Sequence, residues 1–218
     1  MGDKMSFYPI NLDLSDKECA VIGGGKVAWR KVVSLLKAGA KVTVISPELI
    51  EPLFHMAEKE QIVYKKKCYR QGDLTGFFIV ICATNQQMVN RQAAEDAKKN
   101  GALINVVDKS YPNDFIVPAQ VCRGNLLITV STGGQSPAFS RQLQRELSNK
   151  YGDEYAVYLD LIADMRETLK DVLQNSEARV KFWQQAMNQE ILDLIKQGKL
   201  SKAEAEIKNA IGSIRTKS

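Results

Sequence analysis

A glycine-rich segment near the start of the chain has the residue types and spacing that point most clearly to chemistry. Gly23, Gly25 and Ala28 follow a short apolar run in the pattern Gly-x-Gly-x-x-Ala. In that pattern the first glycine permits a tight turn, the second lets the backbone approach a pyrophosphate, and the alanine lets a helix pack on a strand. The segment therefore predicts a dinucleotide site at a helix N-terminus, where amide groups favour anions. The alternative is a merely tight strand-to-helix turn.

The acidic residue that usually holds the adenosine ribose of such a dinucleotide is missing. Ser46 stands at the end of the second expected strand, and Glu48 follows two positions later. A carboxylate at the strand end binds the ribose 2′-hydroxyl of NAD, whereas an arginine nearby accommodates the 2′-phosphate of NADP. Because residues 46–48 include no arginine, we expect NAD to be preferred over NADP.

Two polar side chains follow later strands at the same expected sheet edge. Thr84 comes after an apolar run and is a candidate for lining the cofactor crevice, with loop capping as an equal alternative. Asp108 closes the next strand, where its carboxylate would face the crevice as a general base or orient a substrate nitrogen. From spacing alone, an Asx turn or a helix cap is equally compatible with Asp108.

A second glycine-rich loop, Ser131–Pro137, opens a helix that carries Arg141 and Arg145 on one face. Backbone amides at a helix start, together with basic side chains, favour an anion. A solvated basic face is the commoner explanation for arginines at this spacing. The loop by itself therefore suggests anion binding without specifying the anion.

The elements that must position these residues alternate between strands and helices over the first hundred residues. Apolar runs rich in β-branched residues predict strands, and apolar residues at helical spacing predict helices. The expected strands are Lys17–Gly23, Lys41–Ser46, Gln61–Lys65, Phe77–Ala83 and Ala102–Val107, and the expected helices are Lys26–Ala38, one beginning at Pro47, and Gln87–Asn100. Such alternation indicates an α/β fold with a Rossmann-type parallel sheet covered by helices on both faces.

The pattern changes after Asp108. Phe115–Val121 and Leu126–Ser131 predict a β-hairpin, and only helices are expected beyond it. These helices are Pro137–Lys150 with Ser136 as its N-cap, Asp153–Leu173, Ser176–Asn188, Gln189–Gln197 closed by Gly198, and a last helix opened by the capping box Ser201–Glu204. We therefore expect a Rossmann domain over residues 1–113, a central segment over 114–150 and an all-helical domain over 151–218.

Composition narrows the class of protein. The net charge is +5 with lysines and arginines dispersed along the chain, which argues weakly against nucleic acid and is compatible with a polyanionic small molecule. No apolar run approaches the roughly 20 residues of a membrane helix, and residues 1–13 lack the apolar block of a secretory signal. The cysteines are scattered and His55 is the only histidine, so no metal site is expected. We expect a cytoplasmic location.

Four segments together carry a resemblance to a known family. VIGGGKVAWRK, CATN, NVVDKSYPNDFIVPA and TVSTGGQSPAFSRQLQREL occur in this order and at these separations, and the chain resembles the precorrin-2 dehydrogenase family over essentially its whole length. That family includes the dehydrogenase and ferrochelatase module of siroheme synthases. The resemblance implies a Rossmann domain, a central segment that dimerises with a second copy, and a helical C-terminal domain. It also implies oxidation of precorrin-2 to sirohydrochlorin by NAD, a step toward siroheme or cobalamin.

The resemblance also implies roles for individual residues. The family's cofactor turn falls on Gly23, Gly25, Lys26 and Val27, and its adenosine end falls on Ser46, Pro47 and Glu48. The family's essential aspartate falls on Asp108. A hydroxyl that is phosphorylated in some siroheme synthases falls on Thr132, where those proteins have serine. The methyltransferase domain fused to some members has no counterpart in this sequence.

Charge fits the implied substrate. Precorrin-2 carries eight carboxylates, and a net-positive chain attracts such a polyanion. The candidate substrate-binding residues near the expected crevice or hairpin are Lys109, Arg123, Thr132, Arg141 and Arg145.

Two other functions remain open from the sequence. A bifunctional enzyme would also insert iron or cobalt into sirohydrochlorin, because members of the family differ in this respect. A regulator that senses NAD or gates potassium would carry a glycine fingerprint without catalysis. Such a regulator would need neither Asp108 nor the Ser131–Pro137 loop, and its second strand would normally end in an acidic residue.

Overall fold

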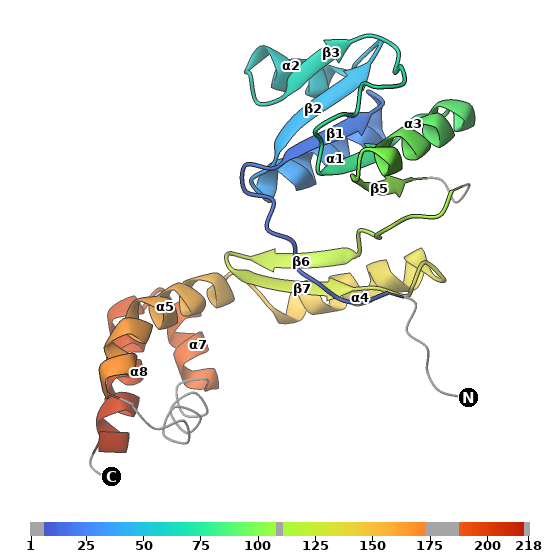
Figure 1. Ribbon diagram of the computed structural model, residues 1–218. Helices are drawn as coiled ribbons and strands as arrows, with labels where there is room; N and C mark the ends of the chain where they lie inside the picture. Colours follow the sequence, from blue (N-terminus) through green and yellow to red (C-terminus); the bar gives the residue numbers. More distant parts are fainter. Residues whose placement is uncertain (1–6, 108–110, 173–187, 216–218) are drawn as a thin grey trace. The chain divides into compact units, whose positions relative to one another are not determined.

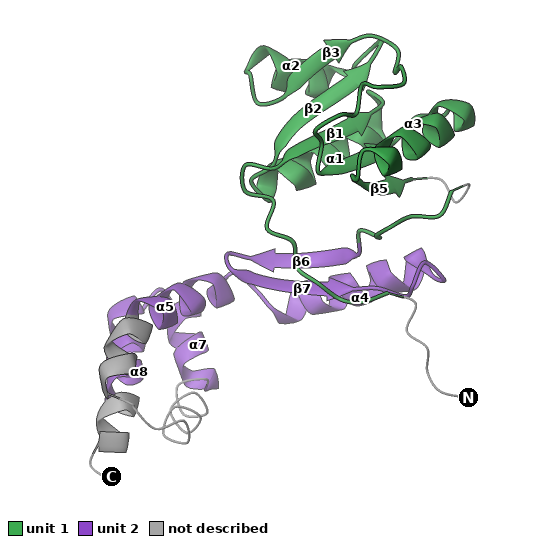
Figure 2. Cartoon of the chain, viewed as in Figure 1, with its two compact units in different colours: residues 1–117 green, residues 118–218 purple. Residues whose placement is uncertain are grey.

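The chain forms two compact units, residues 1–117 and residues 118–218, in a computed structural model that describes residues 7–107, 111–172 and 188–215 (Figures 1 and 2). The hairpin and the C-terminal helices fall in one unit, whereas the sequence suggested separate parts at 114–150 and 151–218. That finer division stays a prediction. Within the described ranges, no helix combines the length and the apolarity needed to cross a bilayer.

The first unit is built on a five-stranded parallel sheet in the order β3-β2-β1-β4-β5. The expected α/β fold and parallel sheet are therefore confirmed. The strands are β1 (Glu18–Ile22), β2 (Lys41–Ser46), β3 (Val63–Lys66), β4 (Ile79–Cys82) and β5 (Leu103–Val106), and the helices are α1 (Lys26–Lys37), α2 (Glu51–Glu58) and α3 (Gln87–Lys99). Strand order reverses at β1, where ligands of open α/β sheets bind at the carboxyl edge.

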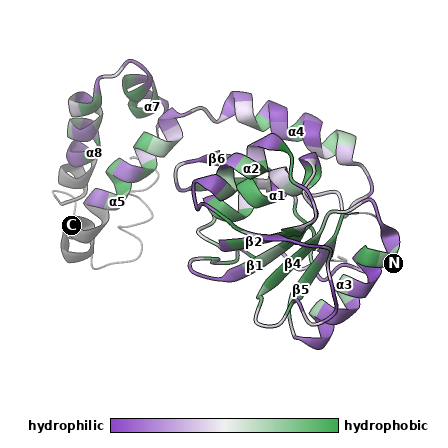
Figure 3. Ribbon diagram, turned by 90° about the horizontal axis from the view of Figure 1, so that it is seen from above, coloured by the Kyte–Doolittle hydropathy of each residue, from purple (hydrophilic) through white to green (hydrophobic). Residues whose placement is uncertain are grey.

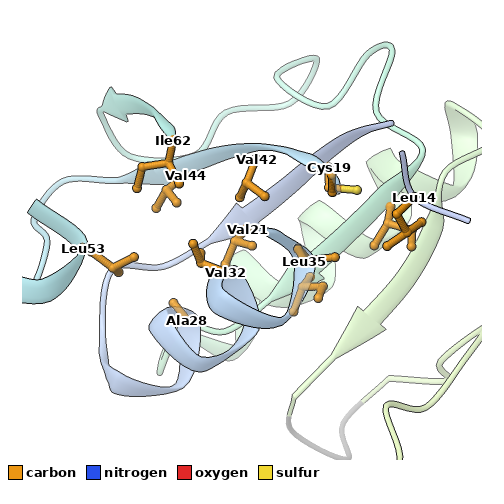
Figure 4. Close-up of a cluster of buried hydrophobic side chains, with 13 residues drawn as sticks. Leu14, Cys19, Val21, Ala28, Val32, Leu35, Val42, Val44, Leu53 and Ile62 are labelled. Atoms are coloured by element: carbon orange, nitrogen blue, oxygen red, sulfur yellow. The ribbon is translucent and has the colours of Figure 1, made fainter. Parts of the chain in front are cut away.

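Two apolar clusters hold helices against the two faces of this sheet. Side chains of α1, such as Val32 and Leu35, pack with Val21 and Val44 on one face (Figure 4). On the other face the fully buried Ala93, Ala94 and Ala97 of α3 bring that helix close to the strands. Figure 3 shows the central strands coloured mainly as hydrophobic, as expected for strands that are buried on both sides.

The free edge of β5 is closed by side chains rather than by a sixth strand. Leu103 N donates to Phe78 O, and Val107 N donates to Cys82 O at the end of β4. Because backbone groups of a strand alternate in direction, the N–H and C=O groups of Ile104 and Val106 face away from β4. Asn113 Oδ1 accepts from Val106 N, and Asn113 Nδ2 donates to Val106 O at 3.1 Å. Asp114 forms the matching pair with Ile104, through Oδ2 at 3.0 Å and through its own N–H at 3.1 Å. These contacts anchor the chain on the far side of residue 108.

The second unit joins an antiparallel hairpin to a group of helices. Its elements are β6 (Ala119–Arg123), β7 (Leu126–Val130), α4 (Pro137–Lys150), α5 (Glu154–Val172), α7 (Gln189–Lys196) and α8 (Leu200–Arg215). Ser136 caps α4 as expected, since its side chain accepts from Phe139 N at 3.3 Å. Tyr158 packs with Ile191 and Ile195 in the helical core, and burial raises the pKa of the Tyr158 hydroxyl to about 12.

Two of the expected helix starts are wrong. Pro47 does not begin a helix, because residues 47–50 form a loop and α2 begins at Glu51, with Pro52 in its first turn. Ser201 does not cap the last helix, because α8 begins at Leu200 and Ala203 N already donates to Lys199 O at 3.1 Å. An i to i−4 bond of this kind makes Lys199 the cap.

The hairpin also begins later than the sequence predicts. β6 starts at Ala119 rather than Phe115. The carbonyl of Phe115 instead accepts from Asn105 Nδ2 at 2.9 Å, and Pro118 has no N–H to donate to a ladder. The helix expected at Ser176–Asn188 lies outside the described residues except for Asn188, whose side chain caps α7.

The β5 edge generates a stability prediction. Replacing Asn113 with alanine leaves a backbone donor and acceptor of the buried Val106 without partners, and we expect a loss of about 1–3 kcal/mol in the free energy of unfolding. Urea unfolding followed by tryptophan fluorescence measures this loss. The measurement uses a Trp183→Phe background, in which Trp29 in α1 is the only tryptophan. The exposed Asn149→Ala serves as the control. A change below about 0.5 kcal/mol for Asn113→Ala, the scale of ordinary surface substitutions, would contradict the assignment.

Candidate functional site

The candidate site lies where the carboxyl ends of β1, β2 and β4 meet the start of α1. Gly23 follows β1 with φ at +117°, a conformation that side chains rarely adopt. Its N–H donates to Ile45 O at 3.0 Å, and a Cβ at this position would lie 2.6 Å from Ala83 O. The tight turn predicted for Gly23 is therefore present, and it needs glycine for both conformation and space.

Gly24 is the residue that sequence reasoning missed. A Cβ at Gly24 would lie 1.9 Å from Glu48 O and 2.8 Å from Ser46 Oγ. The carbonyl of Gly24 accepts from Ile50 N at 2.9 Å. The glycine turn (residues 23–25) and the post-β2 loop (residues 46–50) are thus packed together. The run of three consecutive glycines could have indicated this constraint, but the Gly-x-Gly fingerprint allows any residue at its middle position, which Gly24 occupies.

Gly25 is the N-cap of α1 and stands in open space. Beyond Gly25 and its chain neighbours, no heavy atom of the described residues lies within 4 Å of where its Cβ would be. The Gly25 carbonyl accepts from Trp29 N at 3.0 Å. Gly25 has no side chain with which to cap α1, and the first turn of α1 contains no acidic residue; Lys26 is exposed there and Val27 is half-buried. The amides of a helix's first turn have no intrahelical partner, and together with the helix dipole they make this end suited to an anion.

The post-β2 loop is held by its own hydrogen bonds. Ser46 is buried, and its Oγ donates to Glu48 O at 2.7 Å. Tyr64 OH donates to Pro47 O at 3.2 Å. Burial raises the pKa of Tyr64, and the negative charge of Glu48 raises it further. The Ser46 hydroxyl therefore shapes the loop, while Glu48 leaves its side chain exposed.

The hydroxyl of Thr84 also serves the local structure. Thr84 Oγ1 donates to Asn90 Oδ1 at 2.8 Å and accepts from Gln86 N at 3.1 Å. Asn90 Nδ2 returns a bond to Thr84 O at 3.0 Å. This is the loop-capping role that the sequence left open. The Thr84 methyl would lie 3.4 Å from a Cβ at Gly23, so the residue borders the glycine turn, and its contact with a cofactor stays a prediction.

Asp108 and Lys109 lie outside the described residues. The chain on either side of them is hydrogen-bonded to the sheet. Val107 N donates to Cys82 O at 3.0 Å, so residue 107 continues the carboxyl end of β5. Asn113 returns the chain to the same strand at Val106. Asn113 is the second residue that the sequence analysis did not single out.

The predicted substrate-binding residues of the second unit differ in whether their side chains already form hydrogen bonds within the protein. Arg123 Nη2 donates to Ser148 O at 3.1 Å and to Ser148 Oγ at 2.9 Å, and its Nε lies 3.2 Å from Asp153 Oδ1 without hydrogen-bond alignment. These contacts tie β6 to the end of α4, so they favour a structural role for Arg123.

Thr132 is likewise engaged within its loop. Its Oγ1 accepts from Ser136 N at 3.1 Å and lies 3.1 Å from Ser140 Oγ. Arg141 and Arg145 are exposed on α4. Contacts of the substrate with Arg123, Thr132, Arg141 and Arg145 remain predictions.

His55 is a surface residue of α2, as expected. Its Nδ1 lies 2.9 Å from Glu58 Oε2, and its Nε2 lies 3.7 Å from Glu51 Oε1. The hydrogen bond with Glu58 is the main cause of a raised His55 pKa. In the part of the chain that the structure describes, no group of three histidine, cysteine or acidic side chains is arranged to hold a metal ion.

Comparison with protein families covers both units. Residues 10–119, about half of the chain, match the family described as putative NAD(P)-binding. Residues 123–150 match the central region of sirohaem biosynthesis proteins, and residues 155–211 match the sirohaem synthase dimerisation region. The span described as a dimerisation region thus lies C-terminal to the segment at 114–150 for which the resemblance implied dimerisation.

Individual relatives agree with these families. A siroheme synthase from Methylococcus capsulatus is 36% identical over 92% of this chain, and one from Chromobacterium violaceum is 32% identical over 96%. The chain spans less than half of these relatives, 42% and 44% of their lengths. The solved structure of SirC, a precorrin-2 dehydrogenase, matches with a TM-score of 0.76 at 25% identity, covering 95% of this chain and 100% of SirC. The chain therefore belongs to this NAD(P)-binding family, and it is related to siroheme synthases and to the precorrin-2 dehydrogenase SirC.

Proposed function

We propose that this chain is an NAD-dependent dehydrogenase that oxidises precorrin-2 to sirohydrochlorin in siroheme or cobalamin biosynthesis. The observation that carries the proposal is the open N-terminus of α1 at Gly25, set at the point where strand order reverses. That position is where a Rossmann sheet binds a dinucleotide pyrophosphate. The match along the full length of SirC supports the substrate.

The chain's own residues divide the work of such a site. Backbone amides at Gly25 and Lys26 would bind the pyrophosphate, and the exposed Glu48 would accept a hydrogen bond from the ribose 2′-hydroxyl. NAD, when bound, accepts a hydride at its nicotinamide ring. Asp108 would position the macrocycle or take the proton that the substrate loses together with the hydride.

The substrate's charge agrees with the chain's own. Precorrin-2 is a polyanion, and the chain has a net charge of +5, so association is favoured electrostatically. Arg123 is engaged with Ser148, whereas Arg141 and Arg145 are exposed on α4, so these two arginines are the candidates of the second unit for its carboxylates. All four cysteines are free thiols, which supports a reducing compartment and therefore a cytoplasmic location.

Anaerobic turnover tests the proposed function directly. Purified chain, precorrin-2 and NAD are combined, and the absorption spectrum of sirohydrochlorin is followed together with NADH. Stoichiometric formation of both products is the expected result. NAD binding without turnover would favour an NAD-sensing regulator instead. Adding ferrous or cobaltous ion after the reaction tests whether the chain also acts as a chelatase.

Gly25→Asp tests the cofactor site. The new side chain enters open space at a helix N-cap, where aspartate is favourable, so we expect the protein to remain folded. Its carboxylate would occupy the amides and repel a pyrophosphate, so NAD binding should be lost in calorimetric titration. Gly25→Asn, which blocks the amides without the charge, should bind NAD more weakly than the wild type but more strongly than Gly25→Asp. Unchanged NAD affinity in folded Gly25→Asp would contradict the site.

Asp108→Ala separates catalysis from architecture. If Asp108 takes part in the reaction, turnover should fall about 10²-fold or more, while NAD affinity and thermal stability stay nearly unchanged. Activity retained in Asp108→Asn but lost in Asp108→Ala would assign positioning rather than proton transfer. Full activity in both variants would remove Asp108 from the site.

A homodimer is the expected assembly. The match of residues 155–211 to a dimerisation region supports it. So do the exposed apolar side chains Leu127 on β7 and Phe139 on α4, which are 45% and 50% exposed. A closed dimer would bury the same surface from each copy. Sedimentation at micromolar concentration should give twice the 24.3 kDa chain mass, and a monomer would refute the proposal.

A further inference from the structure

Three consecutive lysines lie along and just beyond β3, the edge strand next to the post-β2 loop, and they have different surroundings. Lys65 Nζ lies 5.7 Å from the centre of the Phe77 ring. Lys67 Nζ forms an ion pair with Asp73 Oδ1 at 2.5 Å. Lys66 is exposed, and it makes no ion pair with any residue that the structure describes. Its ammonium is therefore the uncommitted charge of the three.

The strand register places Lys66 on the side of the post-β2 loop. Ser46 pairs with Lys66, and Ile45 pairs with Lys65. Successive side chains of a strand alternate between faces, so Lys66 shares its face with Tyr64 and Lys65 has the opposite face. Tyr64 OH reaches Pro47 O on the shared face. Lys66 consequently leaves the strand beside the end of β2, at the position where the usual acidic residue of a dinucleotide site is replaced by Ser46.

Glu48 and Lys66 bring opposite charges to this end of the sheet. Glu48 is exposed two residues after Ser46, in the loop whose Pro47 carbonyl accepts from Tyr64 OH. Ser46 is buried with its hydroxyl donated to Glu48 O and is not free to select a cofactor. The two exposed charged side chains are left to distinguish a ribose 2′-hydroxyl from a 2′-phosphate.

We propose that Lys66 is the residue that limits discrimination against NADP, by attracting the 2′-phosphate that Glu48 repels. This inference rests on the proposed binding of a nicotinamide dinucleotide at the glycine turn. A lysine acts on phosphate as a point charge and needs no bidentate geometry, so the absence of an arginine at residues 46–48 does not exclude it. NAD carries only a hydroxyl at this position and gains little from Lys66. Specificity is a difference of two affinities, and Lys66 acts mainly on one of them.

Calorimetric titration of NAD and NADP into three proteins tests the proposal. The wild type is compared with Lys66→Gln and with Lys65→Gln, which removes the same charge from the opposite face. We expect Lys66→Gln to raise the Kd for NADP about fivefold, the upper end for an exposed ion pair, with the Kd for NAD within about twofold. Lys65→Gln should leave the ratio of the two constants unchanged. The difference in the Kd for NADP between the wild type and Lys66→Gln should shrink in 0.5 M salt, because salt screens exposed charges.

The remaining outcomes distinguish a failure of the Lys66 role from a failure of the proposed function. An unchanged ratio in Lys66→Gln, or an equal change in Lys65→Gln, would overturn the role of Lys66 while leaving NAD binding intact. Failure of the wild type to bind either nucleotide would overturn the proposed function itself, and with it this inference. Both lysines are exposed, and a melting curve of each variant checks that the fold is retained.

Discussion

The candidate site depends on the close contact between Gly24 and the carbonyl of Glu48. No side chain fits at position 24, because its Cβ would lie 1.9 Å from that oxygen. The bond from Ile50 N to Gly24 O and the bond from Ser46 Oγ to Glu48 O close the same contact. The turn after β1 and the loop after β2 are therefore packed together as one unit. The anion-binding end of α1 and the side chains that face a ribose are held in fixed relation.

A second constraint acts on the far side of the sheet. The edge strand β5 satisfies its outward backbone groups through Asn113 and Asp114 instead of a neighbouring strand. Buried backbone groups left without partners are costly, so this arrangement fixes where the chain leaves and rejoins the sheet. The short connection between Val107 and Asn113 carries Asp108. Both ends of the proposed catalytic segment are thus tied to the strand beside β4, whose own end borders the glycine turn.

Local patterns predicted the sheet, its helices and the glycine turn, because apolar periodicity and turn chemistry act within a few residues. Gly24 was missed because its constraint comes from Glu48, which is distant in sequence and is brought close only by the parallel pairing of β1 and β2. Pro47 was misplaced for the same reason, since contacts to Gly24 and Tyr64 hold the loop extended. The role proposed for Lys66 depends on the register between β2 and β3. The sequence alone does not specify which of the three lysines lies on the side of the post-β2 loop.

A crystal structure of the chain with NAD tests the central claim most directly. We expect the pyrophosphate to accept hydrogen bonds from the backbone amides of Gly25 and Lys26, with the adenosine ribose beside Glu48 and the post-β2 loop unmoved. NAD bound elsewhere on the chain, or a pyrophosphate that reaches the glycine turn only after the loop separates from Gly24, would contradict it.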